Sequence, residues 1–172
     1  KIEKLNSLNV LRHQEKSTFN FLPNKNWYQK FSQYWTPGEQ NAHEQLSKYL
    51  KTDIEDYKEA RDRPDLDQTS KLSPHLRFGE ISPRTIVFNV LKAKKLTPSV
   101  VTYLSEIGWR EFSYSLLYYS KNLSSIPINL KFQKFPWRKS SKDLDLWKRG
   151  QTGIPLVDAA MKQIYEKGWM HN

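Results

Sequence analysis

Residues 69–84 read Thr-Ser-Lys-Leu-Ser-Pro-His-Leu-Arg-Phe-Gly-Glu-Ile-Ser-Pro-Arg. Within this stretch, Ser73-Pro74 and Ser82-Pro83 each predict a helix start, with serine at the N-cap and proline at the first helical position. Gly79 predicts the end of the first, short helix, because glycine is favoured just beyond a helix C-terminus. The stretch therefore predicts two successive helices joined by a tight turn.

The same stretch also predicts an anion site. Helix N-termini present unpaired N–H groups and the positive end of the helix dipole, so anions bind there. Thr69, Ser70, Lys71 and Ser73 add side-chain donors at the same place. One interpretation is a phosphate-bearing ligand, and the other is ordinary helix capping beside a solvated lysine. The stretch taken alone leaves both open.

The composition of the whole chain excludes several kinds of site. The 172 residues include no cysteine, which excludes disulfides, thiolate catalysis and cysteine-ligated metals and is typical of a reducing compartment. The four histidines show no metal-ligand spacing, so no metal site is expected. No run of eighteen apolar residues occurs, so neither a membrane span nor a membrane partner is expected. The start at Lys1, without a methionine, suggests a piece of a longer protein.

The net charge of +10 is unevenly distributed. Residues 68–172 carry 17 Lys and Arg against 7 Asp and Glu, whereas residues 36–67 carry 5 against 9. The excess of basic residues thus lies in residues 68–172, the part of the chain that also contains the stretch at 69–84. A basic face with interleaved aromatic residues suits nucleic acid, which offers both charge and stacking surfaces. The alternative is a basic protein with no such partner.

The hydrophobic spacing predicts an all-α fold, because helical periodicity recurs after residue 36 and no period-two strand pattern appears. Thr36-Pro37-Gly38-Glu39 is predicted to be a capping box. The longest helix is predicted over about 99–120, and its apolar residues on several faces predict burial among other helices. Residues 121–141 are expected to form a loop held down by Phe132, Phe135 and Trp137. Residues 1–35 have weak periodicity and predict an extended linker before a helical domain at 36–172.

Four polar or aromatic residues share one face of the longest predicted helix. Glu106, Trp109, Arg110 and Ser113 are three or four positions apart. One interpretation is an intrahelical Glu106–Arg110 ion pair with Trp109 filling the core. The other is a pocket wall, where Trp109 stacks on a planar group, Glu106 hydrogen-bonds its edge, and Arg110 meets an anion or fixes the carboxylate.

Three motifs in order carry a family resemblance. These are residues 69–84, Ser-Glu-Ile-Gly-Trp-Arg-Glu-Phe at 105–112, and Gly-Gln-Thr-Gly-Ile-Pro-Leu-Val-Asp-Ala-Ala-Met at 150–161 with Gly-Trp-Met-His-Asn at 168–172. Together they resemble the DNA photolyase/cryptochrome family over about residues 22–172, and most closely its class I cyclobutane pyrimidine dimer photolyases. The resemblance implies the N-terminal part of the helical FAD-binding domain of that family, preceded by an interdomain linker.

The resemblance implies FAD as cofactor, active in its reduced form. The implied FAD-binding residues are Tyr57, Thr69, Ser70, Lys71, Leu72, Ser73 and Tyr103. It also implies UV-damaged DNA as partner, with the dimer flipped out of the duplex. The implied DNA-binding residues are Arg61, Glu106, Trp109, Arg110, Ser113 and Asn172. Glu106 and Trp109 are the implied catalytic residues, Trp109 by stacking on the dimer and Glu106 by a hydrogen bond that stabilises its radical anion.

The implied activity is that of a deoxyribodipyrimidine photo-lyase, which opens the cyclobutane ring by light-driven electron transfer from reduced FAD. Asn172 favours dimer repair, because six-four photolyases and animal cryptochromes usually carry histidine there and plant cryptochromes aspartate. The alternatives are a cryptochrome-type photoreceptor and a flavin-free, basic, helical DNA-binding module. The family also implies a cytoplasmic, DNA-associated protein, monomeric at full length, with an antenna chromophore. The chain is expected to be an incomplete fragment, half of a flavin cradle with its apolar face open to water.

Overall fold

The computed structural model describes residues 25–172, and every regular element in this range is a helix. The elements, with η marking 3₁₀-helices, are η1 (Asn26–Gln33), α1 (Glu39–Thr52), η2 (Ile54–Asp56), α2 (Tyr57–Ala60), α3 (Ser73–Arg77), α4 (Pro83–Ala93), α5 (Pro98–Tyr119), η3 (Leu130–Lys134), α6 (Ser141–Lys148) and α7 (Pro155–Lys167). The all-α prediction is confirmed. None of the helices in this range is long and apolar enough to cross a membrane.

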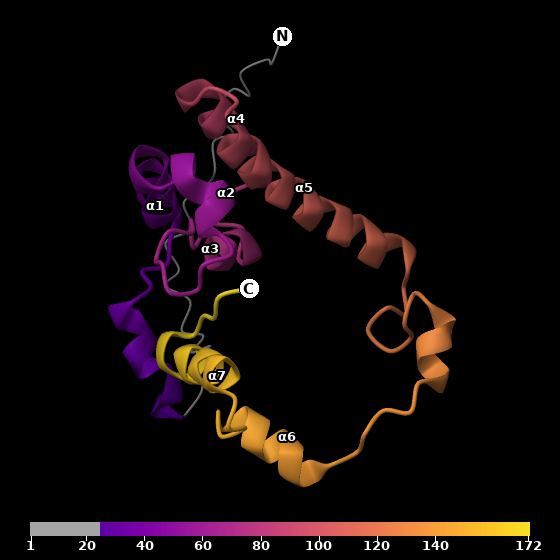
Figure 1. Cartoon of the computed structure of the whole chain (residues 1–172). Coiled ribbons are helices and arrows are strands. Elements are labelled where there is room, and N and C mark those ends of the chain that lie inside the picture. The colour runs from indigo at the N-terminus through magenta and orange to yellow at the C-terminus, as the bar shows by residue number, and fades with distance from the viewer. Residues whose placement is uncertain (1–24) are drawn as a thin grey trace, which may run out of the picture.

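The hydrophobic core lies where α1, η2, α2, α3, α4 and the first half of α5 meet (Figure 1). On α1 an apolar stripe of Ala42, Leu46, Tyr49 and Leu50 is buried. The remaining core side chains come from the other elements named and the turns between them. They are Ile54, Tyr57, Leu72, Leu76, Ile81, Ile86, Val90, Val100, Tyr103 and Ile107.

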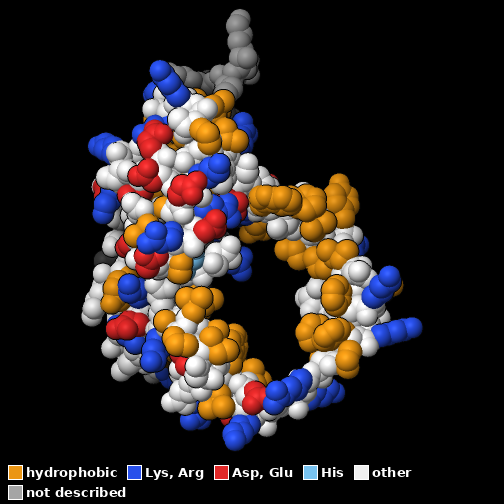
Figure 2. All heavy atoms as spheres, viewed as in Figure 1, with side chains coloured by type: hydrophobic (Ala, Val, Ile, Leu, Met, Phe, Trp, Pro, Cys, Tyr) orange, Lys and Arg blue, Asp and Glu red, His pale blue; other side chains and the backbone are white. Residues whose placement is uncertain are grey.

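Beyond the core the chain forms an open ring. The second half of α5 leads away from the core, and residues 120–140 turn the chain back through α6 to α7, which packs against η1 (Figure 1). Figure 2 shows hydrophobic side chains bordering the opening and Lys and Arg on the outer edge. The prediction that α5 is buried along its length is therefore wrong for its second half, where Phe112 and Leu117 are about half exposed.

Two further local predictions are wrong for a related reason. Phe132, Phe135 and Trp137 do not hold their loop down, since each is at least half exposed. Residues 26–33 are not extended but form η1, in which the Trp27 and Phe31 rings meet edge to face. The rest of the predicted linker, residues 1–24, lies outside the described range.

The helix starts predicted from serine or threonine with proline agree with the structure at one position and differ at two others. Ser82 caps α4 as predicted, because its hydroxyl accepts from the Thr85 amide. Ser73 is instead the first residue of α3, after Leu72 at the N-cap, and no side chain caps this helix. The predicted capping box at Thr36 is also wrong, because α1 begins at Glu39 with Gly38 at its N-cap, where φ is +118°.

Candidate cofactor and nucleic-acid site

A cavity of about 380 Å³ lies between the α2–α3 region and the last residues described. Nine of the residues predicted from the sequence line it: Tyr57, Arg61, Thr69, Ser70, Lys71, Leu72, Ser73, Glu106 and Asn172. The cavity therefore brings together residues from both the implied FAD-binding set and the implied DNA-binding set. These residues come from segments separated by up to 115 positions in the sequence, which only the fold could bring together.

The Thr69–Ser73 loop forms one wall of this cavity. Lys71 adopts a left-handed backbone conformation with φ of +52°, which is uncommon for a residue with a side chain. Gln45 on α1 donates a hydrogen bond to the Ser70 carbonyl at 3.1 Å and so fixes the loop from behind. The Lys71 ammonium pairs with Asp67 and lies 5.7 Å from the centre of the Trp169 ring.

A cross-element ion pair lies at the same cavity. The Arg61 guanidinium, just after α2, hydrogen-bonds the Glu106 carboxylate on α5, and this bond raises the pKa of Arg61. The interpretation of Glu106 and Arg110 as an intrahelical ion pair is therefore wrong. Arg110 pairs instead with Glu111 and donates to the Leu76 carbonyl at 3.2 Å. Arg61 thus holds the Glu106 side chain at the cavity, where the opposite charges of the two partly buried side chains compensate each other.

Three tyrosines form the wall behind the cavity. The ring centres of Tyr57 and Tyr103 are 5.2 Å apart, and those of Tyr49 and Tyr103 are 5.1 Å apart. Burial raises the pKa of Tyr103 to about 12, so its phenol is neutral at every physiological pH. Tyr57 reaches the cavity, whereas Tyr103 is 3% exposed and lies behind it. The structure places Tyr103 as support for Tyr57.

Three predicted residues lie on α5 outside this cavity. Trp109 is 61% exposed, and its ring meets Phe112 edge to face. The Ser113 hydroxyl is occupied by a 2.9 Å bond to the Trp109 carbonyl one turn back. Arg110 is held by its own partners. The four residues share one face of α5 as predicted, but only Glu106 among them lines this cavity.

Sequence reasoning assigned no role to three residues that also line the cavity. These are Trp169, Met170 and His171, which follow the glycine that ends α7. His171 has a buried Nε2 with no hydrogen-bond partner among the described residues. The quoted Gly-Trp-Met-His-Asn motif contained the signal, but only its asparagine was assigned. Met170, His171, Asn172 and Arg61 also line a neighbouring groove of about 770 Å³ along α7.

The loop before α7 is held by one carboxylate. Asp158 accepts hydrogen bonds from the Thr152 amide and hydroxyl, both at 2.7 Å, and from the Gly153 amide at 3.0 Å. The Thr152 bonds contribute most to lowering the pKa of Asp158. Gly150, with φ of +62°, allows the close approach, because a Cβ there would lie 2.9 Å from the Asp158 carbonyl oxygen.

Asp158→Asn is expected to lower the melting temperature at pH 7 and to lose this effect in acid. The folded-state pKa lies below the unfolded value of about 3.9, so the carboxylate's contribution is full above that pH. The contribution is then lost as the pH falls through the folded-state pKa. Thermal melts of both proteins from pH 7 to pH 2.5 measure this, with Asp145→Asn on α6 as control. A difference that persists unchanged in acid would contradict the assignment.

The residues present fit a phosphate-bearing flavin nucleotide. Three loop hydroxyls and a lysine face one cavity, a tyrosine ring borders it, and the unpartnered His171 Nε2 supplies a further polar atom. The adjoining groove extends the space, and four residues line both. Each of the two volumes, about 380 Å³ and about 770 Å³, is within the range of small-molecule sites. Within residues 25–172, no group of His, Asp and Glu is placed to hold a metal ion.

Comparison with known proteins gives a consistent result. Residues 103–172 match the family model described as FAD binding domain of DNA photolyase. A deoxyribodipyrimidine photo-lyase from Agrobacterium fabrum is 40% identical over 91% of this chain and 33% of its own length. Cryptochrome-1 from Arabidopsis thaliana is 34% identical over 80% of this chain and 22% of its own.

Solved structures agree with the sequence matches. A bacterial class III photolyase from Agrobacterium tumefaciens superposes with a TM-score of 0.81 at 38% identity, covering 88% of this chain and 32% of that one. A cryptochrome from Synechocystis superposes with a TM-score of 0.73 at 31% identity, covering 81% and 30%. The fold is thus that of a helical domain of the type found in photolyases and cryptochromes. The chain belongs to the DNA photolyase/cryptochrome family and spans about a third of the length of the relatives it matches.

Proposed function

We propose that this chain forms part of the FAD-binding region of a deoxyribodipyrimidine photo-lyase, which repairs cyclobutane pyrimidine dimers in DNA by light-driven electron transfer. One observation carries the proposal: a single cavity gathers the Thr69–Ser73 loop, the Arg61–Glu106 pair and Asn172. A phosphate-binding loop alone fits many ligands. Here the loop lies in the same cavity as the Arg61–Glu106 ion pair and the Asn172 amide. Because the chain is also similar to named photolyases, this combination favours the proposed function.

In this proposal the loop residues hold FAD. The hydroxyls of Thr69, Ser70 and Ser73 and the Lys71 ammonium hydrogen-bond the diphosphate and the ribityl chain, while Leu72 and Tyr57 give apolar contact. Tyr103 supports Tyr57 from behind. Reduced FAD, when bound, supplies the electron that opens the cyclobutane ring. Because Lys71 is already held between Asp67 and Trp169, little side-chain freedom is lost when phosphate binds.

The DNA-binding residues act on a nucleotide that has left the duplex. A dimer stacks poorly, so flipping it out costs less than flipping a normal base, and photolyases are among the established users of this strategy. Trp109 stacks on the extruded dimer, and Glu106 and Asn172 hydrogen-bond its edges. Arg61, Arg110 and Ser113 contact DNA nearby, and the basic surface gives salt-dependent affinity for phosphates.

A cryptochrome-type photoreceptor is the second candidate function. The similarity to Cryptochrome-1 and to the Synechocystis cryptochrome favours it, because each is more than 30% identical in sequence to this chain over the aligned residues. The class of photolyase is also part of the proposal, since the resemblance points to class I while the structural neighbour is titled a class III photolyase. From the resemblance we further infer an antenna chromophore and a monomer acting on DNA in the cytoplasm.

Binding measurements on the protein at its natural length test the proposal. The purified protein is expected to show the absorption of bound flavin and to prefer an oligonucleotide with one thymine dimer over its undamaged copy in competition. Bound flavin without this preference would favour the photoreceptor. A colourless protein that binds both oligonucleotides equally would favour a flavin-free DNA-binding module and overturn the proposal.

Glu106→Gln is expected to lower the yield of repair per absorbed photon about fivefold. A neutral amide replaces a charged hydrogen-bonding group, which weakens the contact to the dimer by about 1 kcal/mol. Flavin content is expected to stay unchanged, because Glu106 belongs to the DNA side of the cavity. Single-turnover repair under calibrated light measures the yield, and Glu59→Gln, at an exposed position on α2, is the control. An unchanged yield in Glu106→Gln would remove Glu106 from the proposed mechanism.

A further inference from the structure

We propose that Trp35 and Phe31, which precede α1, are positioning residues that fix the direction in which residues 169–172 leave α7 and enter the cavity. The consequence for repair rests on the proposed function. The placement itself rests on contacts between two segments that are far apart in the sequence: η1 with Trp35, and the end of α7.

The first contact is a hydrogen bond at the C-terminus of α7. The Trp35 indole N–H donates to the carbonyl of Lys167, the last residue of the helix. The last four carbonyls of a helix have no partner within it, so a donor from outside is needed to satisfy them. Trp35 therefore acts as an external cap and holds the end of α7 in one place.

The second contact is steric and lies one residue further along. Gly168 has φ of +68°, the left-handed conformation in which glycine ends a helix. A Cβ on Gly168 would lie 2.9 Å from two carbon atoms of the Phe31 ring. The Phe31 ring therefore rests directly on the backbone at the point where the chain changes direction.

These two contacts act together with two others at the cavity. Gln163 on α7 accepts a hydrogen bond from the His171 amide at 3.2 Å, and Lys71 lies over the Trp169 ring. Between Gly168 and Asn172, the extended chain spans up to about 13 Å. A rotation of about 10° at Gly168 thus moves Asn172 by about 2 Å, and a misplacement of about 1 Å can cost about 100-fold in rate.

The core does not depend on these residues. The buried cluster is built from α1 to α5 and the turns between them, and it contains neither Phe31 nor Trp35 nor any residue of α7. Removing the Trp35 hydrogen bond is therefore expected to loosen the end of α7 while leaving the core packed. This separates a positioning role from a general role in stability.

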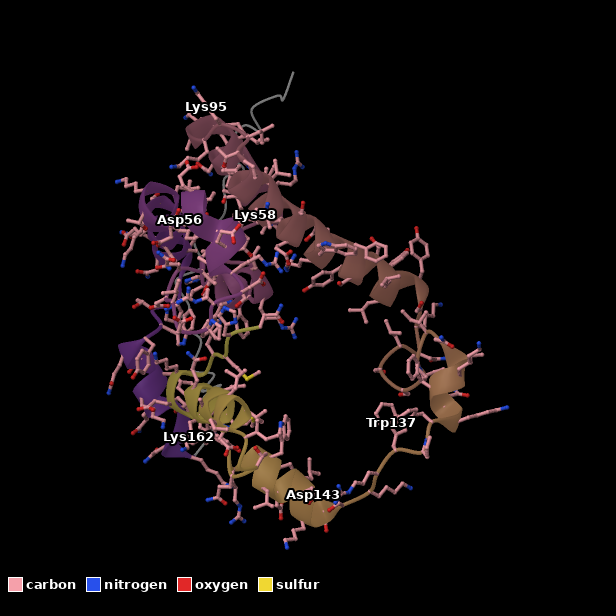
Figure 3. The ribbon with its side chains drawn as sticks, in the orientation of Figure 1. Asp56, Lys58, Lys95, Trp137, Asp143 and Lys162 are labelled. Carbon is pink, nitrogen blue, oxygen red and sulfur yellow. The ribbon has the colours of Figure 1, made fainter. Side chains whose placement is uncertain are left out.

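The test compares two variants that each lose one indole-to-carbonyl hydrogen bond, in the protein at its natural length. Trp35→Phe removes the bond to Lys167, and Trp137→Phe, the control, removes a 3.2 Å bond to the Phe132 carbonyl. Trp137 lies across the ring from Lys162 on α7 (Figure 3). Amide hydrogen exchange of a peptide covering 168–172 is expected to be about 3- to 10-fold faster in Trp35→Phe only, with α1 and α4 unchanged.

The functional readout is the ratio of affinities for dimer-containing and undamaged DNA, measured well below the melting temperature. Trp35→Phe is expected to lower this ratio at least about tenfold and Trp137→Phe to leave it unchanged. Faster exchange with an unchanged ratio, or faster exchange throughout the core, would overturn the positioning role. If the unmodified protein shows no preference for dimers, the proposed function fails, and the exchange data alone then decide whether Trp35 fixes this segment.

A second pair of variants tests the contact with Phe31. Gly168→Ala is expected to lower the affinity ratio, because the new Cβ meets the Phe31 ring and favours a different backbone direction. Adding Phe31→Ala removes the ring and is expected to restore part of the loss, although the cost of the left-handed alanine remains. A double variant no better than Gly168→Ala alone would contradict the steric contact.

Discussion

Lys71→Glu is expected to weaken FAD binding by at least about 100-fold. A hydrogen bond to a charged group contributes about 1.5–3 kcal/mol, which is roughly 10- to 150-fold in affinity. The substitution also places a carboxylate where the diphosphate is proposed to bind, and this adds repulsion. Lys71 lines the cavity, and its ammonium lies 5.7 Å from the centre of the Trp169 ring, which lines the cavity as well.

Titration of the apoprotein with FAD, followed by flavin fluorescence, measures this loss. Lys71→Met separates loss of the charge from repulsion and is expected to fall between the wild type and Lys71→Glu. Lys95→Glu makes the same charge change on an exposed lysine just beyond α4, remote from the cavity (Figure 3), and is expected to bind FAD normally. Equal FAD affinity in Lys71→Glu and Lys95→Glu would show that the Thr69–Ser73 loop does not hold the phosphates.

Trp109→Ala is expected to reduce affinity for dimer-containing DNA by about 5- to 150-fold and to leave affinity for undamaged DNA nearly unchanged. Stacking of a base on an aromatic ring contributes about 1–3 kcal/mol, and an indole that is 61% exposed has a face free for it. Only an extruded dimer can reach this ring, because a paired base remains inside the duplex. The loss should therefore fall on damaged DNA alone.

The matched control for this prediction is Trp137→Ala. Trp137 is exposed to a similar extent, 66%, and also lies among aromatic neighbours, but it belongs to the loop across the ring from α7. Competition binding with damaged and undamaged duplexes at fixed salt measures both variants. An equal loss of affinity for the two duplexes in Trp109→Ala would assign Trp109 to phosphate or backbone contact and contradict the stacking role.

Residues that typically begin or end helices predicted several of the helix limits. Ser82 marked the start of α4, and Gly79, with φ of +73°, lies just beyond the end of α3 as predicted. These signals act within a few residues, so they need no knowledge of the tertiary structure. The start of α1 was missed because Gly38 replaces the expected threonine cap. There the His75 hydrogen bond and, less strongly, the Gly38 amide lower the pKa of Glu80, which takes part in fixing that turn.

The sequence indicated which segments meet at the cavity, but not how their side chains pair. The family resemblance named nine of the residues that line the cavity, seven of them within the quoted motifs. The partner of Glu106 depends on how α2 crosses α5, which the spacing along α5 cannot reveal, so the pairing of Glu106 with Arg61 was not predicted. The support from Phe31 and Trp35 was missed for the same reason, since it joins residues more than 130 positions apart. The burial of α5 was overestimated because an apolar helix predicts a covering surface that residues 25–172 do not supply.

Light-dependent repair is the most direct test of the central claim. The protein at its natural length, with its flavin reduced, is mixed with an oligonucleotide containing one cyclobutane thymine dimer and then illuminated or kept in the dark. The proposed function predicts restored thymines in the illuminated sample only, with fewer turnovers in Glu106→Gln. Bound, reduced flavin with no repair in the light would contradict the photolyase assignment and favour a photoreceptor.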